Sequence, residues 1–349
     1  MENILEKKDI RALSQEELKQ VFAALREPAF RAVQVYEWLW KKSVSSFESM
    51  RNLPKTLIEK LQEDYAIRPA ALHQSQKSND GTIKSTFRLH DGHIIEGVLI
   101  PAEDRMTACV SSQVGCSLTC KFCATGYMER KRNLEAGEIY DQVVLIDRQA
   151  RESYGKPLSN IVYMGMGEPL LNYKSVMASV DRLTGEDGLN LSYKRITVST
   201  AGIAKMIRKL GDDGARFNLA LSLHAANDKK RNEIMPINEQ NSLEALRDAL
   251  KYYFSRTKNP VTYEYIVFNN FNDTLEDARE LAFFCRHVPC KVNIIEYNPI
   301  EFADFRNTAE DKLEAFAAYL RRQDINVHIR RSRGKDIDAA CGQLAVKEK

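Results

Sequence analysis

Hydrophobic and polar positions along the chain change their periodicity near residue 80. Before that point, apolar residues recur at helical intervals, as at Val21, Phe22 and Leu25. The segment Ser14-Gln15-Glu16-Glu17 just before this run has the pattern of a helix capping box. We therefore expect residues 1–80 to form a small helical accessory domain.

Aromatic and basic residues cluster in this helical region. Tyr36, Trp38, Trp40, Lys41 and Lys42 could contact nucleic acid, but a helical Trp more often belongs to the core of a domain. No site is assigned to these side chains.

A β-hairpin is predicted next, over residues 81–106. Two runs with strand character, Thr82 to Leu89 and His93 to Ile100, are separated by Asp91-Gly92, a favoured two-residue turn.

From Thr107 onward, short apolar runs alternate with amphipathic helical stretches. Six strand-then-helix units of this kind predict an α/β fold with a parallel sheet, whose ligand site lies at the carboxyl ends of the strands. A last strand, Ile325 to Arg330, precedes a tail rich in Arg, Gly and Ser. The six strand candidates are Thr107 to Ser111, Asn160 to Met164, Arg195 to Ser199, Phe217 to Leu223, Val261 to Phe268 and Val292 to Tyr297.

Composition narrows the class of protein. The 349 residues carry 51 basic and 48 acidic side chains, so a net charge of +3 does not by itself indicate a polyanionic partner. No apolar run reaches the roughly 18 to 20 residues that span a bilayer, and Met1 to Lys8 lacks the apolar region of a signal peptide. We expect a soluble cytoplasmic protein with no membrane contact, and monomeric.

Three of the seven cysteines form C-x3-C-x2-C directly after the first parallel strand: Cys116, Cys120 and Cys123. Three thiolates can bind three irons of a four-iron, four-sulfur cluster and leave the fourth iron open to an exchangeable ligand. A zinc knuckle and three unliganded thiols are the alternatives, but structural zinc usually has four protein ligands and no fourth Cys or His lies nearby.

The triplet, with an aromatic residue just before its third cysteine, resembles the radical S-adenosylmethionine (SAM) superfamily, and the strand-helix order resembles the partial (β/α)6 barrel of that superfamily. The resemblance implies one 4Fe-4S cluster whose open iron is chelated by SAM. It also assigns Gly167 and Glu168, in the turn Met164 to Pro169, to the SAM amino group, whereas the turn alone could be an ordinary glycine-rich loop. The implied division is 1–80, 81–106, a radical SAM core at 107–330, and a tail at 331–349.

Longer stretches resemble the RlmN family of RNA methyltransferases and, more distantly, the Cfr proteins. They are Glu27 to Ala32, Cys109 to Cys116, Gly165 to Pro169, Val198 to Gly202, Leu221 to Ala225, Tyr297 to Pro299 and Arg333 to Leu344. This resemblance implies formation of 2-methyladenosine in 23S rRNA and in tRNA next to the anticodon, with an electron donor such as flavodoxin or ferredoxin. It also implies that the accessory domain, residues 1–80, binds RNA. A Cfr-like enzyme acting on adenine C8 and a noncatalytic, metal-bearing RNA-binding protein are the alternatives.

The reaction that the resemblance implies uses two further cysteines and two SAM molecules per turnover. Adenine C2 is electron-poor and cannot attack a methyl sulfonium as an ordinary nucleophile. Cys341 is expected to take a methyl group from one SAM, and a radical made from a second SAM then activates that methyl group for addition to the base. Cys109 is expected to release the product by forming a disulfide with Cys341. Without the resemblance, Cys341 reads as an incidental tail thiol and Cys109 as a core thiol.

The remaining site residues are also assigned by resemblance. Glu96 interrupts the apolar run His93 to Ile100, and it is either the proton acceptor or a buried salt-bridge partner. Cys285 and Cys290 match no role. Residues at or past strand ends, which could also be ordinary satisfied loop residues, are expected to contact SAM: Ser199, Ser222, Leu223, His224 and Asn298.

Basic clusters in expected loops could contact RNA phosphates, although charge runs are usually solvated surface. They are Arg130-Lys131-Arg132, Lys229-Lys230-Arg231 and Arg330-Arg331-Ser332-Arg333.

Overall fold

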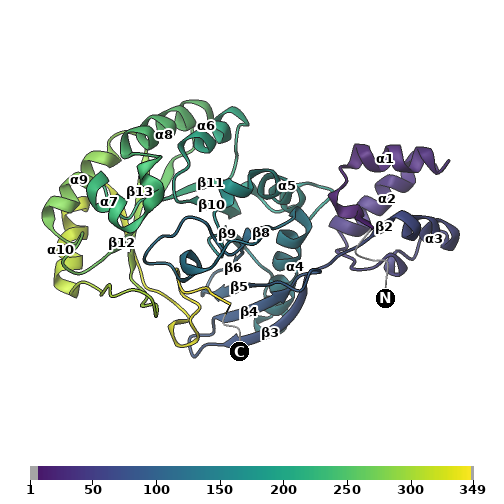
Figure 1. Ribbon diagram of the computed structural model, residues 1–349, viewed down its shortest axis with the longest axis horizontal. Coiled ribbons are helices and arrows are strands. Elements are labelled where there is room, and N and C mark those ends of the chain that lie inside the picture. Colours follow the sequence, from purple (N-terminus) through teal and green to yellow (C-terminus); the bar gives the residue numbers. More distant parts are fainter. Residues whose placement is uncertain (1–6, 347–349) are drawn as a thin grey trace.

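A computed structural model describes residues 7–346, as a large α/β body with a smaller helical domain projecting from one side (Figure 1). Most of the N-terminal stretch Met1 to Lys8, considered above for a signal peptide, lies outside the described residues, as do residues 347–349. None of the helices in the described range is long and apolar enough to cross a membrane.

The helical domain has the capping box that the sequence predicts. The Ser14 backbone N–H donates to Glu17 Oε2 at 2.7 Å, and Glu17 N–H donates to Ser14 Oγ at 3.2 Å, which satisfies two N–H groups at the start of α1. A two-stranded parallel pair joins the ends of the domain. Its elements are β1 (Lys8–Asp9), α1 (Gln15–Ala24), α2 (Ala29–Trp40), α3 (Lys55–Asp64) and β2 (Tyr65–Ala66).

Trp40 belongs to the core of the structure. Its ring packs edge-on against Tyr140 of the large body at 5.0 Å between centroids, and the residue is 1% exposed. Trp38 is half-buried, with the Lys42 ammonium 3.6 Å from its ring centroid. A buried ion pair between Arg11 and Asp141 (2.8 Å) also joins the two parts, so the helical domain is docked on the large body.

The large body is built on one ten-stranded sheet with seven neighbouring parallel strands, and the fold class is as the sequence predicts. These seven strands occur in the sheet in their order along the chain, so every crossover moves the same way, as in a barrel. The sheet is not closed, since β3 (Ala71–Lys77) and β14 form its two edges. The parallel strands are β6 (Met106–Cys109), β9 (Asn160–Tyr163), β10 (Ile196–Thr200), β11 (Asn218–Ser222), β12 (Val261–Val267), β13 (Cys290–Glu296) and β14 (Asn326–Arg330).

Helices follow the parallel strands and cover the outer face of the sheet (Figure 1). Side chains along a strand alternate between the face covered by helices and the interior of the curved sheet. In β6, Ala108 is buried, whereas Thr107 faces the interior and is half-exposed. The helices are α4 (Ala136–Tyr154), α5 (Tyr173–Thr184), α6 (Ala204–Asp212), α7 (Asp228–Ile234), α8 (Leu243–Thr257), α9 (Leu275–Cys285) and α10 (Glu310–Arg321).

The predicted hairpin is present as β4 (Ile83–Arg88) and β5 (Ile94–Pro101), and it extends the sheet antiparallel to β6. The expectation of helix up to residue 80 is wrong for residues 71–77, which form edge strand β3 paired with β4. All seven residues of β3 are exposed. Because neither face of this strand is buried, its sequence carries no alternation of apolar and polar residues that would have indicated a strand.

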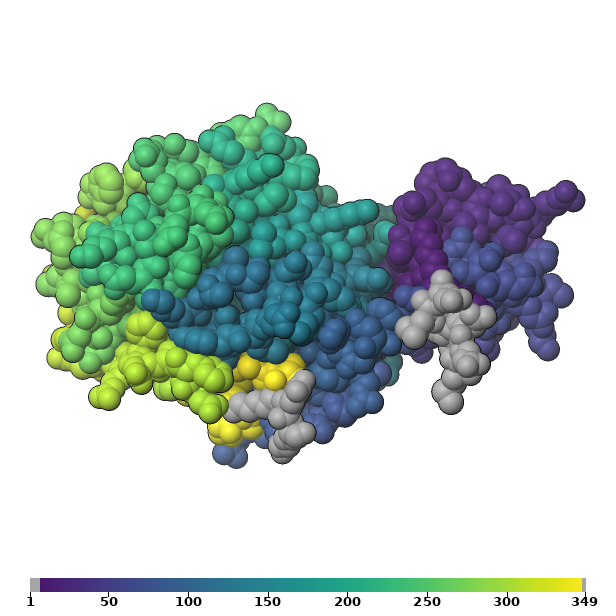
Figure 2. Space-filling view, viewed as in Figure 1, coloured from purple at the N-terminus to yellow at the C-terminus, as the bar shows by residue number. Residues whose placement is uncertain are grey.

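The C-terminal segment, residues 331–346, lies against this antiparallel extension (Figure 2). Asp336 accepts hydrogen bonds from the Ser78 hydroxyl and the Asn79 backbone N–H, and Gly334 N–H donates to Asp80 Oδ2 at 2.9 Å. The segment is thereby held between β14 and the hairpin, and its first part lies beside Pro101, which pairs with Met106 at the start of β6.

Candidate active site

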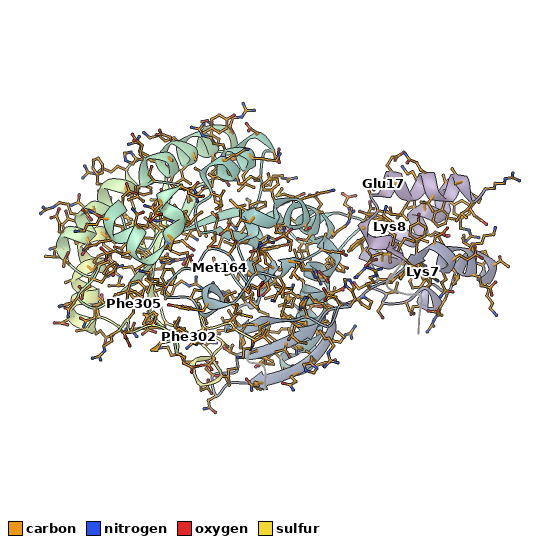
Figure 3. All side chains as sticks on the ribbon, in the orientation of Figure 1. Lys7, Lys8, Glu17, Met164, Phe302 and Phe305 are labelled. Atoms are coloured by element: carbon orange, nitrogen blue, oxygen red, sulfur yellow. The ribbon has the colours of Figure 1, made fainter. Side chains whose placement is uncertain are left out.

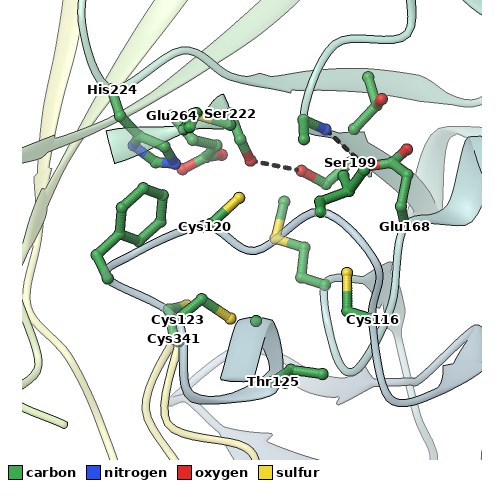
Figure 4. Close-up of a pocket in the computed structure, with 18 of the residues that line it drawn as sticks. Cys116, Cys120, Cys123, Thr125, Glu168, Ser199, Ser222, His224, Glu264 and Cys341 are labelled. Atoms are coloured by element: carbon green, nitrogen blue, oxygen red, sulfur yellow. Dashed lines mark hydrogen bonds between the residues drawn. The ribbon is translucent and has the colours of Figure 1, made fainter. Parts of the chain in front are cut away.

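A cavity of about 160 Å³ lies at the carboxyl ends of the parallel strands, where such a sheet is expected to bind its ligand (Figure 4). Both ends of the barrel sequence contribute to it, from the loop after β6 to the C-terminal segment. The site residues that line it are Cys116, Cys120, Cys123, Gly167, Glu168, Ser199, Ser222, His224 and Cys341.

The cysteine triplet lies on one wall of this cavity, in the loop between β7 (Gln113–Val114) and β8 (Arg132–Asn133). Gly115, with φ +75°, starts this loop, and a Cβ there would lie 2.1 Å from the Glu129 carbonyl oxygen, so only glycine fits. Phe122 packs edge-on against the His224 ring at 4.7 Å between centroids. Burial raises the pKa of the Cys116 thiol to about 11, so a bare thiolate is disfavoured there and a positively charged ligand would stabilise it.

The donor set of the triplet fits a cluster better than a single metal ion. Within residues 7–346, no three His, Cys, Asp or Glu side chains are grouped so that they could hold one metal ion. The thiolates of a four-iron cluster bind different irons and need not converge on one point. Three thiols on one wall, facing a cavity with a buried carboxylate on another, suit a cluster with an exchangeable ligand on its open iron.

The glycine-rich turn after β9 approaches the β7 strand very closely. Gly167 has φ +92°, and a Cβ there would lie 2.4 Å from the Gln113 Cβ atom. Gln113 Oε1 in turn accepts the Glu168 backbone N–H at 2.8 Å. The Glu168 carboxylate, 3% exposed, accepts the backbone N–H groups of Leu170 (3.0 Å) and Ala201 (2.7 Å). Burial raises its pKa, and its position on the cavity wall suits contact with a cationic group such as an ammonium.

Polar groups from β10 and β11 complete this wall. Ser199 and Ser222, on neighbouring strands, have hydroxyl oxygens 3.4 Å apart (Figure 4). His224 has φ +55°, and its Nδ1 accepts the Ile266 backbone N–H at 3.0 Å. Burial lowers the pKa of His224 to about 3, so the ring is neutral. The Leu223 side chain is in the hydrophobic core and does not line the cavity.

Asn298 also lies outside the walls of the cavity. Its Nδ2 donates to the Cys341 backbone carbonyl at 3.1 Å, so it holds the C-terminal segment in place, and no partner is found for its buried Oδ1 among the described residues. The segment is held from the other side by Ala124 N–H, which donates to the Gly342 carbonyl at 2.6 Å. The loop that carries the cysteine triplet and the segment that carries Cys341 are therefore hydrogen-bonded directly to each other.

Cys341 and Cys109, distant in sequence, line one second cavity of about 590 Å³ that adjoins the first. Cys341 lines both cavities, next to Cys123 in Figure 4. Cys341 is exposed to the cavity, although protein surrounds the residue. Burial within this surrounding protein raises the pKa of the Cys341 thiol, and the positive charge of the Arg330 guanidinium opposes this increase. Cys109 is buried at the end of β6, which raises its pKa to about 12.

Glu96 is buried in β5 and lines neither cavity. Its Oε1 lies 3.6 Å from the Lys84 ammonium, and its Oε2 accepts the Ala345 backbone N–H at 3.0 Å. The salt bridge considered from the sequence is thus present, and the same carboxylate also anchors the C-terminal segment. Burial raises its pKa despite Lys84.

Two charged residues were not assigned to the site from the sequence: Glu264 was not considered, and Arg330 was considered only within a basic cluster that could contact RNA. Glu264 of β12 and Arg330 of β14 line both cavities and approach each other to 3.5 Å. A charged residue inside an apolar strand is the same signal that drew attention to Glu96, and it is present in the run Val261–Val267. Met164, near the centre of the body in Figure 3, also lines both cavities.

Of the three basic clusters, the one at residues 229–231 is only partly on the surface, since Lys229 is exposed and Arg231 is buried. Arg231 is 0% exposed, and its guanidinium donates to the carbonyls of Ala201, Ser222 and Leu223 at the ends of β10 and β11. It satisfies strand ends around the cavity, and hence cannot contact phosphates. Arg130 and Lys131 are exposed, as are Arg331 and Arg333.

Comparisons with known proteins agree with this architecture. Residues 110–284 match the radical SAM superfamily and residues 8–67 match the ribosomal RNA large subunit methyltransferase N-terminal domain. The probable dual-specificity RNA methyltransferase RlmN of Cytophaga hutchinsonii is 63% identical over 99% of this chain and 94% of its own length. The Flavobacterium johnsoniae relative of the same description is 54% identical over 99% of both chains.

A solved structure shares nearly the whole fold. The crystal structure of a radical SAM methyltransferase from Sphaerobacter thermophilus superposes with a TM-score of 0.90 at 41% identity, over 97% of this chain and 99% of that one. Full-length similarity at this level, together with both domain matches, leads to one conclusion. The chain belongs to the RlmN family of radical SAM RNA methyltransferases.

Proposed function

We propose that this enzyme forms 2-methyladenosine in 23S rRNA and in tRNA at the adenine next to the anticodon, as the description of its relatives as dual-specificity enzymes suggests. The observation that supports this most strongly is the meeting of Cys341 with the cysteine triplet in one cavity and with Cys109 in the next. A methyl-carrying thiol, its resolving partner and the site of radical generation must be adjacent for such a reaction.

The triplet would hold a 4Fe-4S cluster and the opposite wall would bind SAM. When bound, the cluster would supply the electron that cleaves SAM reductively. Glu168 is suited to bind the SAM amino group, with Ser199, Ser222 and neutral His224 as polar contacts to the rest of the molecule. Gly167 lets the turn approach closely. Leu223 and Asn298 act indirectly, because their side chains lie outside the cavity wall.

The cysteines of the chain would perform the methyl transfer. Cys341 takes a methyl group from SAM through its sulfur, assisted by Arg330, whose positive charge favours the thiolate. After the activated methyl group has added to the base, the Cys109 thiolate attacks the Cys341 sulfur and the bond between that sulfur and the methylene carbon breaks. The carbon keeps the electron pair and takes a proton, so a Cys109–Cys341 disulfide forms and the methylated RNA is freed. Their common cavity makes this step possible without a large movement of β6.

Glu96 is proposed as the acceptor of the proton that leaves the adenine. Its raised pKa suits a base, and its hydrogen bond to Ala345 N–H shows that the carboxylate reaches the C-terminal segment that carries Cys341. That bond must be exchanged when substrate enters.

The wider setting is also proposed. Residues 1–80 would help to bind RNA, 81–106 would connect and anchor the tail, 107–330 would be the catalytic core, and 331–349 would carry the methyl acceptor. The enzyme would act as a monomer in the cytoplasm, where both RNAs occur, and a flavodoxin or ferredoxin would be its electron donor.

Nucleoside analysis tests this proposal. The anaerobically purified enzyme is incubated with methyl-labelled SAM, a reductant and either rRNA or tRNA, and the RNA is digested for mass mapping. We expect label on C2 of adenine, and label on Cys341 before RNA is added. Cys290→Ala removes a cysteine that has no proposed role, and this control variant should behave as wild type. An 8-methyl product would indicate Cfr-like chemistry, and colourless protein with stoichiometric zinc would indicate a noncatalytic RNA binder.

A further inference from the structure

The second cavity extends from the cysteine pair to the amino-terminal ends of the strands, opposite the face with the triplet. Neighbouring strands contribute inward-facing residues at matching heights. Thr107 of β6 pairs with Asn160 of β9, and Thr262 of β12 pairs with Lys291 of β13, near the starts of these strands. Asn293, which lies two residues after Lys291 in β13, pairs with His328 of β14. The cavity therefore runs along the interior of the sheet.

Polar side chains line this interior together with apolar ones, whereas barrel interiors are usually filled by bulky Val, Ile and Leu side chains. Thr107, Asn160 and Thr197 lie in central strands of the sheet and are nevertheless half-exposed, because the cavity beside them is open. Threonine, asparagine and histidine at these positions stabilise no core. The residues that keep this second cavity open, which is called the passage below, therefore have a role other than packing of the core.

Residues 331–344 form the remaining wall of the passage. Arg333 donates a hydrogen bond to the Pro101 carbonyl, which bridges the tail to the end of β5. Arg105 and Lys291, both exposed, lie at the amino-terminal rim. Among the described residues, the lining contains the basic residues Arg105, Lys291, Arg330, Arg331 and Arg333 and one carboxylate residue, Glu264. Arg330 is paired with Glu264, and Arg331 is paired with Glu296 and Glu310 outside the lining, so the excess positive charge comes from Arg105, Lys291 and Arg333. An anion entering from this face would be favoured over a cation.

We propose that this passage is the binding site and entry route of a small anionic thiol that reduces the disulfide between Cys109 and Cys341. This inference depends on the proposed function, since it needs that disulfide to form. The thiolate attacks the exposed Cys341 sulfur, the S–S bond breaks, and Cys109 leaves as a thiolate near Arg330 and takes a proton. A second thiol attacks the mixed disulfide, so Cys341 returns to a thiol and the two small thiols leave as one oxidised disulfide.

The position of the passage would let a thiol reach the two sulfurs while the SAM site is occupied. SAM and RNA would occupy the cavity at the carboxyl ends of the strands, and the passage reaches the two sulfurs from the opposite end. Cys341 and Arg330 line both cavities, so they form part of the boundary between them. The enzyme could then be reset without first emptying its SAM site.

Charge-selective labelling tests the passage without requiring turnover. Cluster-loaded enzyme with unmethylated Cys341 is saturated with S-adenosylhomocysteine, which fills the first cavity and donates no methyl group. It is treated with the methanethiosulfonate of either ethylsulfonate or ethyltrimethylammonium, two reagents of similar size and opposite charge. Labelling of Cys341 is followed by peptide mass spectrometry. The anionic reagent should react about tenfold faster relative to the cationic one than it does with a free thiol peptide.

A rim variant and a matched control sharpen this test. Arg105→Glu with Lys291→Glu reverses two charges at the rim and should lower the anion-to-cation ratio about tenfold. Lys229→Glu with Lys251→Glu makes the same charge change at exposed positions on α7 and α8 and should leave the ratio near that of wild type. Equal ratios in all three proteins overturn the proposal.

Turnover then tests the use of the passage. With mercaptoethanesulfonate as the only thiol, repeated methylation by the rim variant should slow about tenfold relative to wild type, and with cysteamine it should not slow. Comparing each thiol between the two proteins cancels its intrinsic reactivity. Charge-selective labelling without this effect on turnover refutes the reducing role, whereas a wild-type enzyme that makes no methyladenosine with any thiol refutes the proposed function instead.

Discussion

Gly167→Ala should weaken SAM binding through one buried side chain, Gln113. An added Cβ would lie 2.4 Å from the Gln113 Cβ, 2.7 Å from its Cγ and 2.8 Å from its Oε1, so Gln113 must shift by roughly 1 Å to restore ordinary contacts of about 3.5 Å. Gln113 cannot shift freely, because its Oε1 accepts the Glu168 N–H and its Nε2 donates to Asn133, each at 2.8 Å.

The magnitude follows from these contacts. The left-handed backbone at φ +92° costs an alanine about 1–2 kcal/mol, and the loss of one buried hydrogen bond costs about 1–3 kcal/mol more. Because the lost bond positions Glu168, which faces the proposed SAM site, we expect SAM to bind roughly fivefold to one-hundredfold more weakly.

Gly214→Ala is the matched control. Gly214 also has positive φ, at +64°, but nothing lies within 4 Å of an added Cβ, so only the backbone cost applies. Equilibrium dialysis with labelled SAM on cluster-loaded protein, and urea unfolding of both variants, separate the two effects. If Gly167→Ala matches Gly214→Ala in SAM affinity and in unfolding free energy, the role given to Gln113 and Glu168 is wrong.

Three further outcomes are expected. Replacement of any one triplet cysteine by alanine should lower iron content and abolish SAM cleavage, measured by iron analysis and chromatography, and full values for both would contradict the cluster assignment. Cys109→Ala should accumulate protein covalently bonded to RNA on denaturing gels, whereas Cys341→Ala should form neither adduct nor product; normal turnover by Cys109→Ala would exclude its resolving role. Glu96→Gln should fold but lose turnover. Because burial raises the Glu96 pKa, this group's contribution to stability is full below the ordinary value of 4.5 and is lost as pH rises through the raised value, so the unfolding free energy of Glu96→Gln relative to wild type should increase with pH in urea titrations; a constant difference would contradict the shift.

The strands of the core could be located from the sequence alone because their burial is local. Each parallel strand has apolar residues at every second position or more often, and all seven are found within a few residues of their expected positions. The cysteine triplet was equally readable, since its three residues are close in sequence and any loop that carries them brings them together.

Strand β3 shows where such reading fails. Its sequence alternates no apolar residues because both of its faces are exposed, and it is a strand only because the free edge of β4 offers backbone hydrogen bonds. Arg231 shows the same limit for charge. A run of three basic residues resembles surface, yet its third member is buried by the carbonyl ends of two strands that are not adjacent to it in the chain.

The sequence by itself determined the order of strands and helices, the loop that carries the cysteine triplet and, through family resemblance, the candidates for the site residues. Only the tertiary structure decided that Cys341 meets both the triplet and Cys109, that Glu96 anchors the tail, and that a second cavity runs from these two cysteines toward the starts of the strands. The physical reason is that periodicity and capping act between neighbours in the chain. A cavity is formed by side chains from many strands, and its shape depends on how those strands pair.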